Sequence, residues 1–319
     1  MPRAMFSSVI NTVVPVFGLI LLGWLCGKGG LFKESATEAL NRFVIYLALP
    51  ALLFIAMARS DLEAMAELEF VASFSLGTLL TMLAYLWLCR RESLAYQPKM
   101  LNALSAGYSN AGYMGIPLIL LLFGDEALPI AVIGAVLTVV VQFGLTIIAI
   151  EIHRAKGRSL WPAIKKVVLS LMRNPILVST VLGVTCSGLG IVIPVPIASG
   201  IEQLGNAATP CALLTIGLFI AQTRVQAGSR SVTQIVALKL LLHPLLVGVF
   251  ALGVFDLDPV WAWCAILATA LPVGTGPFML ANLYQEDAAV TARAILVSTL
   301  LSVVTLTALI AWVNVQGIA

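Results

Sequence analysis

Two hydrophobic segments broken by glycine and proline decide the fold of this chain: Tyr108-Ser-Asn-Ala-Gly-Tyr-Met-Gly-Ile-Pro117 and Leu271-Pro-Val-Gly-Thr-Gly-Pro277. Their final prolines lie 160 residues apart (277 − 117) in a chain of 319, so each half carries one break at an equivalent place. A broken helix leaves backbone N–H and C=O groups unpaired. At membrane depth such groups are tolerated only where they line a protein or water-filled cavity, so the paired breaks indicate the binding site of a secondary transporter.

The composition is typical of an integral membrane protein. Hydrophobic residues make up 60% of the chain and charged residues 10%, whereas soluble domains carry about 25% charged residues; the mean hydropathy is +1.03. We expect an all-α fold of ten transmembrane helices with short connections, the longest at 151–173, since each apolar stretch is near the ~20 residues that cross the hydrocarbon core. These stretches are 8–27, 38–58, 70–89, 101–123, 127–150, 174–193, 197–222, 232–253, 260–284 and 290–313.

The positive charges predict the orientation of the helices. Fifteen of the eighteen Lys and Arg residues lie in or beside connections that follow odd-numbered stretches: Lys28, Lys33, Arg42, Arg90, Arg91, Lys99, Arg154, Lys156, Arg158, Lys165, Lys166, Arg173, Arg224, Arg230 and Arg293. Positive connections stay cytoplasmic, so segment 151–173 is expected inside and both termini outside. The net charge of +3 then reflects topology, and we expect no nucleic-acid partner.

The chain also reads as two inverted repeats. A shift of 160 residues places Pro15 on Pro175, Pro50 on Pro210 and Pro117 on Pro277. Each half, 1–150 and 174–319, holds five predicted helices, and an odd number turns the second half upside down relative to the first. The alternative is chance similarity between apolar helices.

The breaks predict a site for an anion. Proline suits the first position of a helix because its missing N–H would be unpaired there anyway, so we expect Pro117 and Pro277 to begin half-helices. Each half-helix start carries a partial positive charge and free N–H donors. Asn110 and Ser109 add polar groups at the first break, and Thr275 adds one at the second. Alternatively, these prolines only kink their helices.

Ionisable residues within the predicted helices are few. Lys239 and His243 lie one turn apart on the eighth stretch, and buried ionisable groups in a membrane are often functional, which suggests a proton or charge role. Alternatively, Lys239 extends to the cytoplasmic interface. The sequence has no H-E-x-x-H motif, no phosphate-binding loop and no metal or redox spacing among its five cysteines, so we expect neither an enzyme nor a cofactor or metal.

Three motifs resemble the auxin efflux carrier family, including its bacterial members. They are Leu40-Asn-Arg-Phe-Val-Ile-Tyr-Leu-Ala-Leu-Pro-Ala-Leu-Leu-Phe54, Asn110-Ala-Gly-Tyr-Met-Gly-Ile-Pro-Leu118 and Leu271-Pro-Val-Gly-Thr-Gly-Pro-Phe278. The resemblance implies a fold like that of sodium/proton antiporters and bile-acid transporters. Spans 1, 2, 6 and 7 would form a scaffold, often dimeric, and spans 3–5 and 8–10 a moving transport domain with crossed helices 4 and 9.

The resemblance also implies which residues bind substrate. Asn110 matches the family's crossover asparagine, Pro117 and Pro277 match its crossover prolines, and Leu49 matches a pocket wall on the scaffold. The plant carriers have a glutamine where this chain has Val273, which argues against auxin itself as the substrate. The expected site is completed by further residues of the same motifs: Pro50, Ser109, Gly112, Thr275, Gly276 and Phe278 at the substrate, and Gly115 and Gly274 as hinges.

The sequence therefore predicts a bacterial inner-membrane secondary carrier for a small organic anion, expected to be a carboxylate, that works by an elevator-like movement. A coupling proton or sodium and a homodimer are part of this expectation. Two alternatives remain open: a sodium-coupled symporter of the bile-acid type, and a membrane sensor that binds a metabolite without moving it.

Overall fold

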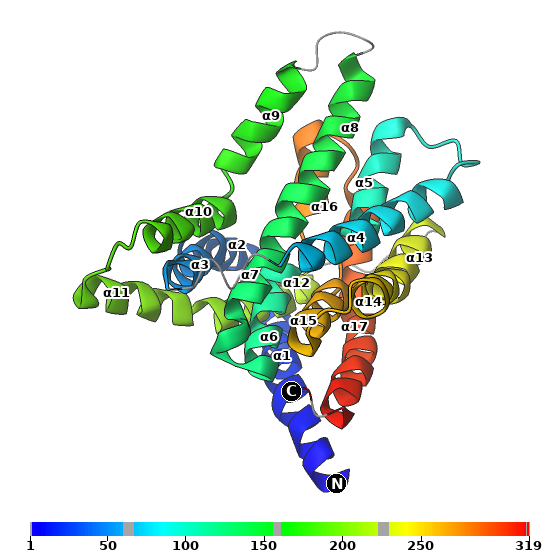
Figure 1. Ribbon diagram of the computed structural model, residues 1–319. Helices are drawn as coiled ribbons and strands as arrows, with labels where there is room; N and C mark the ends of the chain where they lie inside the picture. Colours follow the sequence, from blue (N-terminus) through cyan, green and yellow to red (C-terminus); the bar gives the residue numbers. More distant parts are fainter. Residues whose placement is uncertain (1, 60–66, 156–160, 223–229, 317, 319) are drawn as a thin grey trace.

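A computed structural model describes residues 2–59, 67–155, 161–222, 230–316 and 318. Every regular element in these ranges is a helix (Figure 1). The one feature of β type among the described residues is an isolated antiparallel bridge between Ser109 and Val273. The described part of the chain is therefore all-α, as the sequence predicts.

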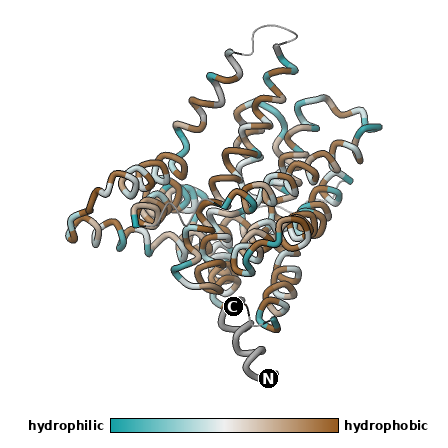
Figure 2. Tube along the Cα trace, viewed as in Figure 1, coloured by the Kyte–Doolittle hydropathy of each residue, from teal (hydrophilic) through white to brown (hydrophobic). Residues whose placement is uncertain are grey.

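The helices have the length and surface of an integral membrane protein. Six are long and apolar enough to span a membrane: Glu34–Ala58, Leu68–Leu88, Asp125–Arg154, Val195–Gln222, Arg230–Val254 and Ala289–Val315. Four shorter apolar helices accompany them: Val14–Lys28, Ala111–Phe123, Pro175–Gly188 and Pro259–Ala270. Hydrophobic residues run along most helices (Figure 2), and large ones such as Leu21, Leu83, Val181 and Val304 are exposed. A surface of this kind is stable in lipid and not in water.

The described residues of the first half of the chain form twelve helical segments up to Ala155. Several join end to end, with a π-helical turn (η) between two α-helical parts. They are α1 (Pro2–Lys28), α2 (Glu34–Phe43), η1 (Val44–Ala48), α3 (Leu49–Ala58), α4 (Leu68–Leu88), α5 (Tyr96–Gly107), η2 (Ala111–Gly115), α6 (Ile116–Phe123), then the short 3-10 turn η3 (Asp125–Ala127), α7 (Leu128–Leu137), η4 (Thr138–Phe143) and α8 (Gly144–Ala155).

The described residues of the second half, from Trp161 to Val315, form eleven helical segments. Asn174 caps α10 and Asp258 caps α15, since their side chains accept hydrogen bonds from Ile176 N at 3.0 Å and Val260 N at 2.9 Å, and a proline follows each cap at the start of the helix. The segments are α9 (Trp161–Met172), α10 (Pro175–Gly188), α11 (Val195–Asn206), α12 (Ala208–Gln222), α13 (Arg230–Ala237), η5 (Leu238–Leu242), α14 (His243–Gly248), η6 (Val249–Val254), α15 (Pro259–Ala270), α16 (Gly276–Tyr284) and α17 (Ala289–Val315).

Three of the π-helical turns lie directly before an internal proline. η1 precedes Pro50, η2 precedes Pro117, and η5 precedes Pro244. Proline cannot donate the intrahelical hydrogen bond, and its ring collides with the carbonyl four residues earlier. A wider turn relieves that collision, so these helices continue through their prolines instead of ending there.

The predicted connection at 151–173 is mostly helical. α8 continues to Ala155, and α9 occupies Trp161–Met172, while Lys156 and Arg158 lie outside the described residues. The apolar residues Trp161, Ile164, Val168 and Met172 recur at helical spacing and are exposed on α9. That amphipathic pattern is shorter than a membrane span, which is why the length criterion missed the helix.

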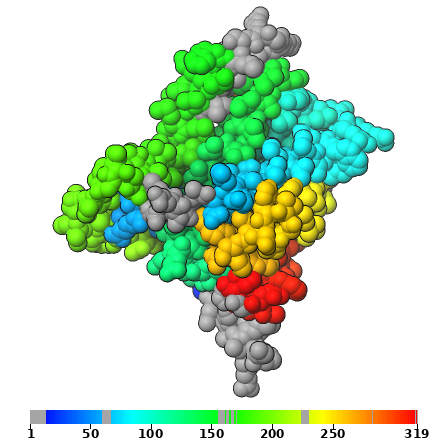
Figure 3. Space-filling model, viewed as in Figure 1, coloured from blue at the N-terminus to red at the C-terminus, as the bar shows by residue number. Residues whose placement is uncertain are grey.

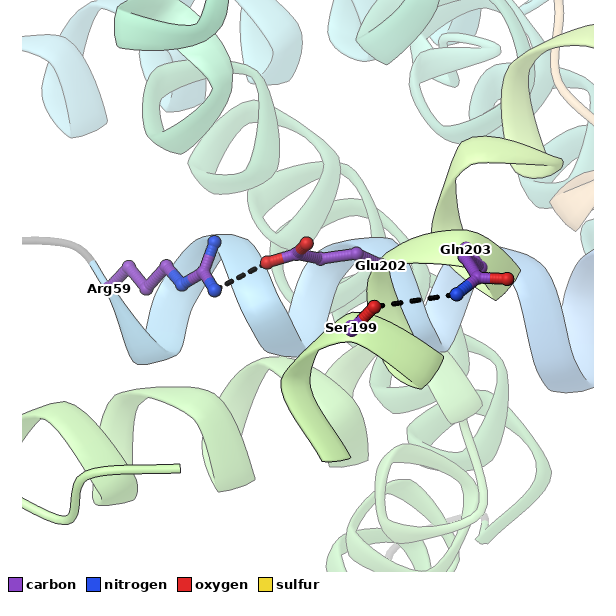
Figure 4. Close-up of polar contacts among 4 residues, drawn as sticks. All are labelled: Arg59, Ser199, Glu202 and Gln203. Atoms are coloured by element: carbon purple, nitrogen blue, oxygen red, sulfur yellow. Dashed lines mark hydrogen bonds and ion pairs between the residues drawn. The ribbon is translucent and has the colours of Figure 1, made fainter. Parts of the chain in front are cut away.

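One group of helices packs around α3. α3 contacts α10 on one side and α11 on another, and α2, α3, α10 and α11 gather together in Figure 1. At the end of α3, Arg59 pairs with Glu202 of α11, and Gln203 donates to Ser199 Oγ within α11 at 3.4 Å (Figure 4). α12 follows α11 and packs along α1.

A second group packs around α4. α4 contacts α5, α14 and α15, and α14 contacts α15. A Cβ on Gly77 of α4 would lie 2.9 Å from the backbone nitrogen of Val247 in α14, so only glycine permits this close approach of the two helices. The two helix groups together surround the two broken segments described next.

Candidate functional site

The two broken segments cross each other in the interior. α5 ends at Gly107 and helix resumes at Ala111, while α15 ends at Ala270 and α16 begins at Gly276. Between these ends the backbone is extended, and the two extended pieces run antiparallel. Asn110 N donates to Pro272 O at 2.9 Å, and Gly274 N donates to Tyr108 O at 3.0 Å. We call residues 108–110 and 271–275 together the crossover.

The sequence explains why the crossover is tight. The ring of Tyr108 lies over the second segment, where a Cβ on Gly274 would be 3.0 Å from the ring and a Cβ on Gly276 would overlap it. Glycine at both positions therefore lets the two chains approach. Pro272 has no N–H to leave unpaired, and its carbonyl is the one that accepts from Asn110.

A third element completes the pairing. Val273 N donates to Ser298 Oγ of α17 at 3.0 Å, and Ser298 Oγ in turn donates to Ile295 O at 3.1 Å. Ser298 and Val273 are both completely buried. Sequence reasoning missed Ser298, because one serine in a long apolar helix commonly bonds only to its own helix.

Each second half-helix presents free N–H groups at the crossover. Asn110 O accepts the first intrahelical bonds from Met114 N at 3.0 Å and Gly115 N at 3.2 Å, so the N–H groups of residues 111–113 precede them. At the other segment the first such bond runs from Met279 N to Thr275 O at 3.1 Å. The N–H groups of Gly276 and Phe278 therefore precede it. Two helix N-termini thus meet the crossed backbones.

The first half-helix begins earlier than expected, because the π-helical turn η2 precedes α6, in whose first turn Pro117 lies. Helix begins at Ala111, directly after Asn110, and Pro117 lies six residues later, behind the π-helical turn η2. The wide turn admits Pro117 without ending the helix. Pro277 is the second residue of α16, where a proline fits a helix start. The hinge candidate Gly115 lies in η2 against Leu271, with a potential Cβ at 2.8 Å from its side chain.

Polar and apolar side chains border the crossover. Asn110 is 7% exposed and Ser109 is 1% exposed, and Ser109 Oγ has no hydrogen-bond partner among the described residues. Thr275 is exposed and Phe278 half-buried. Together these groups combine an unpaired hydroxyl, an amide and the exposed side chain of Thr275.

The first group of helices reaches the crossover through apolar side chains. A Cβ on Gly112 would lie 3.6 Å from Ile176 Cδ1 and 3.8 Å from Leu49 Cδ1. Leu49 is buried and Pro50 half-buried. The Leu49 side chain thus lies beside the first half-helix, where the resemblance placed a pocket wall.

Lys239 does not extend to the membrane surface. Lys239 and His243 are both completely buried. Lys239 Nζ donates to Thr269 O at 2.5 Å, and His243 Nε2 lies 2.9 Å from Thr78 Oγ1. Thr269 belongs to the last turn of α15, just before the crossover. Lys239 is therefore tied to the end of the broken helix, a position that the sequence pattern alone did not reveal.

Known proteins provide an independent comparison. A family profile described as "Membrane transport protein" matches residues 8–310. This chain belongs to the membrane transport protein family. A family member of Rhizobium meliloti (strain 1021) named "Putative malonate transporter" is 33% identical over 317 residues, covering 95% of each chain.

Other relatives of this family extend across kingdoms. An "Uncharacterized transporter" of Methanothermobacter thermautotrophicus is 28% identical over 308 residues, 94% of this chain and 97% of its own. The "Probable auxin efflux carrier component 5c" of rice, Oryza sativa subsp. japonica, is 24% identical over 367 aligned positions, 97% of each chain. The resemblance to auxin efflux carriers is thereby confirmed, and these relatives are named as transporters and not as enzymes.

Proposed function

We propose that this protein is a secondary active transporter of a small organic anion, a carboxylate, which it binds at the crossover. The observation that carries the proposal is the meeting of two helix N-termini at two antiparallel, hydrogen-bonded backbone segments. Each N-terminus supplies partial positive charge and N–H donors. Ser109 Oγ and the Asn110 amide add hydrogen-bonding groups for the carboxylate oxygens.

The names of the relatives favour the same class of substrate. One is named for malonate and others for auxin, and both of these molecules are carboxylates. The relative that is 33% identical to this chain over 95% of each chain is the one named for malonate. A compact dicarboxylate such as malonate is therefore our first choice.

Two inverted repeats of five helices supply the symmetry for this site. Gly23 of α1 approaches the backbone of Leu214, and Gly183 of α10 approaches the backbone of Phe54, with a potential Cβ at 2.6 Å from Phe54 O. Adding 160 to Gly23 gives Gly183, and subtracting 160 from Leu214 gives Phe54. The two close contacts are thus equivalent under the repeat, which supports the ten-span arrangement of residues 1–150 and 174–319.

Transport would proceed by an elevator-type movement between two helix groups. Spans 1, 2, 6 and 7, here α1–α3 and α10–α12, form the scaffold, and spans 3–5 and 8–10 form the transport domain with the crossover. The contacts of α3 with α10 and α11, and of α4 with α5, α14 and α15, support this division. A second copy of the chain would join through the scaffold.

The expected orientation and location complete the proposal. Both termini face the periplasm of a bacterial inner membrane, and the positively charged connections face the cytoplasm. Arg224, one of the residues behind that assignment, lies outside the described residues. Single-cysteine labelling from each side of intact vesicles would test it.

The first experiment is thermal unfolding of purified protein with a panel of mono- and dicarboxylates, indole acids and sodium. A ligand that binds the folded state raises its stability by mass action. We expect small carboxylates to raise the unfolding midpoint. We also expect proteoliposomes that contain the protein to take up each carboxylate that raises it. A rise with sodium alone would favour the symporter of the bile-acid type. Binding without any flux would favour a sensor.

A further inference from the structure

A cluster of buried polar side chains lies beside the crossover. Its members, called the polar cluster below, come from α4, η4, η5, α14 and α15: Thr78, Gln142, Lys239, His243 and Thr269, all 0% exposed. α4 contacts α14, and α14 contacts α15. In the space-filling view, α4 (blue to cyan) and α14 (yellow) lie side by side on the face shown (Figure 3).

Hydrogen bonds join the histidine to two neighbours. Gln142 Nε2 donates to Thr78 Oγ1 at 3.3 Å, and His243 Nε2 lies 2.9 Å from the same oxygen. The Thr78 hydroxyl can donate to that nitrogen or accept from it, so the contact is compatible with either tautomer of the ring. His243 Nδ1 and Gln142 Oε1 have no hydrogen-bond partner among the described residues.

Lys239 is held by a carbonyl and not by a carboxylate. Among the residues that the structure describes, Nζ donates one hydrogen bond, to Thr269 O at 2.5 Å. None of the other titratable groups on the described elements packed around it pairs with Nζ. These groups are Glu69, Tyr85 and Cys89 at α4, Tyr96 and Lys99 of α5, Arg230 of α13, His243 of α14, Cys264 of α15 and Arg293 of α17.

Two opposing effects therefore act on the amine of Lys239. Complete burial without an anionic partner favours the neutral form. The C-terminal end of α15, which carries partial negative charge and unpaired carbonyls, favours the ammonium form. A further negative charge nearby would decide between the two forms.

The crossover lies close enough to supply that charge. Thr269 precedes Pro272 by three residues, and Pro272 O accepts the hydrogen bond from Asn110 N. Three residues of chain span at most about 10 Å. An anion at the crossover would therefore lie roughly that far beyond the carbonyl that Lys239 holds, in a protein interior that screens charge poorly.

We propose that Lys239 is a proton-binding site coupled to the anion site: its amine takes up a proton when an anion occupies the crossover and releases it when the anion leaves. The lone pair of the neutral amine forms an N–H bond to a proton that hydronium delivers, and the O–H bond that breaks leaves a water molecule. The carrier would then move a proton together with its anion. This inference rests on the proposed function.

Calorimetry of malonate binding in buffers of different ionisation enthalpy measures this proton directly. At a pH where malonate is fully ionised, we expect uptake of up to one proton per malonate bound. The slope of binding enthalpy against buffer ionisation enthalpy reports that number. A zero slope in the unmodified protein at every pH from 6 to 9 (about the range that membrane proteins tolerate) would overturn the proposal.

Variants separate the role of Lys239 from a purely structural one. Lys239→Met should abolish proton uptake and weaken malonate binding about tenfold, because one charge near the anion is lost. Lys239→Arg stays charged at every accessible pH, so it should bind malonate without proton uptake. Lys165→Met, on exposed α9, and His243→Gln should keep the uptake. Unchanged uptake in Lys239→Met or Lys239→Arg would overturn the proposal.

Separate control experiments test whether each variant folds and whether the anion site exists. Each variant is first checked by its thermal unfolding midpoint, and if Lys239→Arg unfolds, Lys239→Gln and Lys239→Met carry the test. In proteoliposomes an inside-alkaline gradient should drive malonate accumulation by the unmodified protein and by Lys165→Met, and not by Lys239→Met. Absence of binding by any carboxylate would overturn the anion site itself, an outcome distinct from binding without proton uptake.

Discussion

Tyr113 of the first broken helix donates a hydrogen bond to the side chain of Asn41 on α2, from Oη to Oδ1 at 2.6 Å. This bond joins the helix that borders the crossover to α2, a member of the group of helices around α3. Both residues lie outside the crossover itself, and Asn41 is half-buried. The contact therefore stabilises the particular arrangement of the two groups seen in this structure.

Tyr113→Phe should change the balance between transport states. Loss of one hydrogen bond costs about 1 kcal/mol, which is about fivefold in an equilibrium. We expect an altered initial rate of uptake in proteoliposomes, with the same effect in Asn41→Ala and no further effect in the double variant. Tyr46→Phe, at an exposed position on η1, is the control. Additive effects of the two substitutions would show that the bond does not act between the groups.

Asn110→Ala tests the anion site. It removes one amide from the crossover and little packing, so the unfolding midpoint without ligand should stay near that of the unmodified protein. A hydrogen bond to a charged group contributes about 1.5–3 kcal/mol, so carboxylate affinity should fall about 10- to 100-fold. Asn206→Ala is the matched control, because it makes the same substitution at an exposed position at the end of α11. Equal affinities of the two variants would remove Asn110 from the site.

Gly276→Ala tests the close crossing of the two chains. A Cβ there would overlap the ring of Tyr108, and α16 or Tyr108 must shift. Over-packing of this kind costs about 1–3 kcal/mol, and we expect a lower unfolding midpoint together with loss of transport. Gly200→Ala on α11, where nothing lies within 4 Å of an added Cβ, should leave both unchanged. Full transport by Gly276→Ala would contradict the crossing as the working site.

Ser298→Ala tests the third element of the crossover. Without Ser298 Oγ the buried N–H of Val273 has no acceptor, which costs about 1–3 kcal/mol. Ser302→Ala in the same helix is a matched control, because Ser302 is equally buried and bonds only to Thr299 O of its own helix, at 2.8 Å. We expect Ser298→Ala to unfold at a lower temperature than Ser302→Ala. The reverse order would mean that Val273 N finds another acceptor.

Gly183→Ala tests the packing of α10 against α3. Its Cβ would lie 2.6 Å from Phe54 O and 2.7 Å from Met57 Cβ, so the helices must separate, at a cost of about 1–3 kcal/mol. Gly18→Ala on α1 meets only the Val14 side chain at 4.0 Å and is the control. Comparison of the two unfolding midpoints is the measurement, and equal midpoints would show that α10 and α3 tolerate a wider separation.

The apolar stretches and the two breaks were predictable from the sequence for a simple physical reason. Length and hydropathy alone determine which segments enter a membrane, and glycine and proline act on the chain locally, as at Leu271-Pro-Val-Gly-Thr-Gly-Pro277. Helix α9 escaped this reasoning because it is amphipathic and short. The start of the first half-helix was misplaced because a π-helical turn lets a helix continue past Pro117.

The partners of individual side chains were less predictable. The bond between Lys239 and Thr269, 30 residues later, depends on how η5 lies against α15, and neither segment has a periodicity that fixes this contact. The same holds for Ser298 and Val273. In an apolar helix the hydrophobic pattern marks no inward face, because lipid and protein interior are similar solvents.

Main-chain atoms alone make the two hydrogen bonds between the crossed segments. Substitution of most side chains around them leaves those bonds intact, so a mutation can change the polarity around the crossed segments without breaking their pairing. The pairing of the two backbones is therefore compatible with many different side chains around it. The strictest limit on this variation lies at Gly274 and Gly276, where a side chain would collide with the ring of Tyr108 and push the two segments apart.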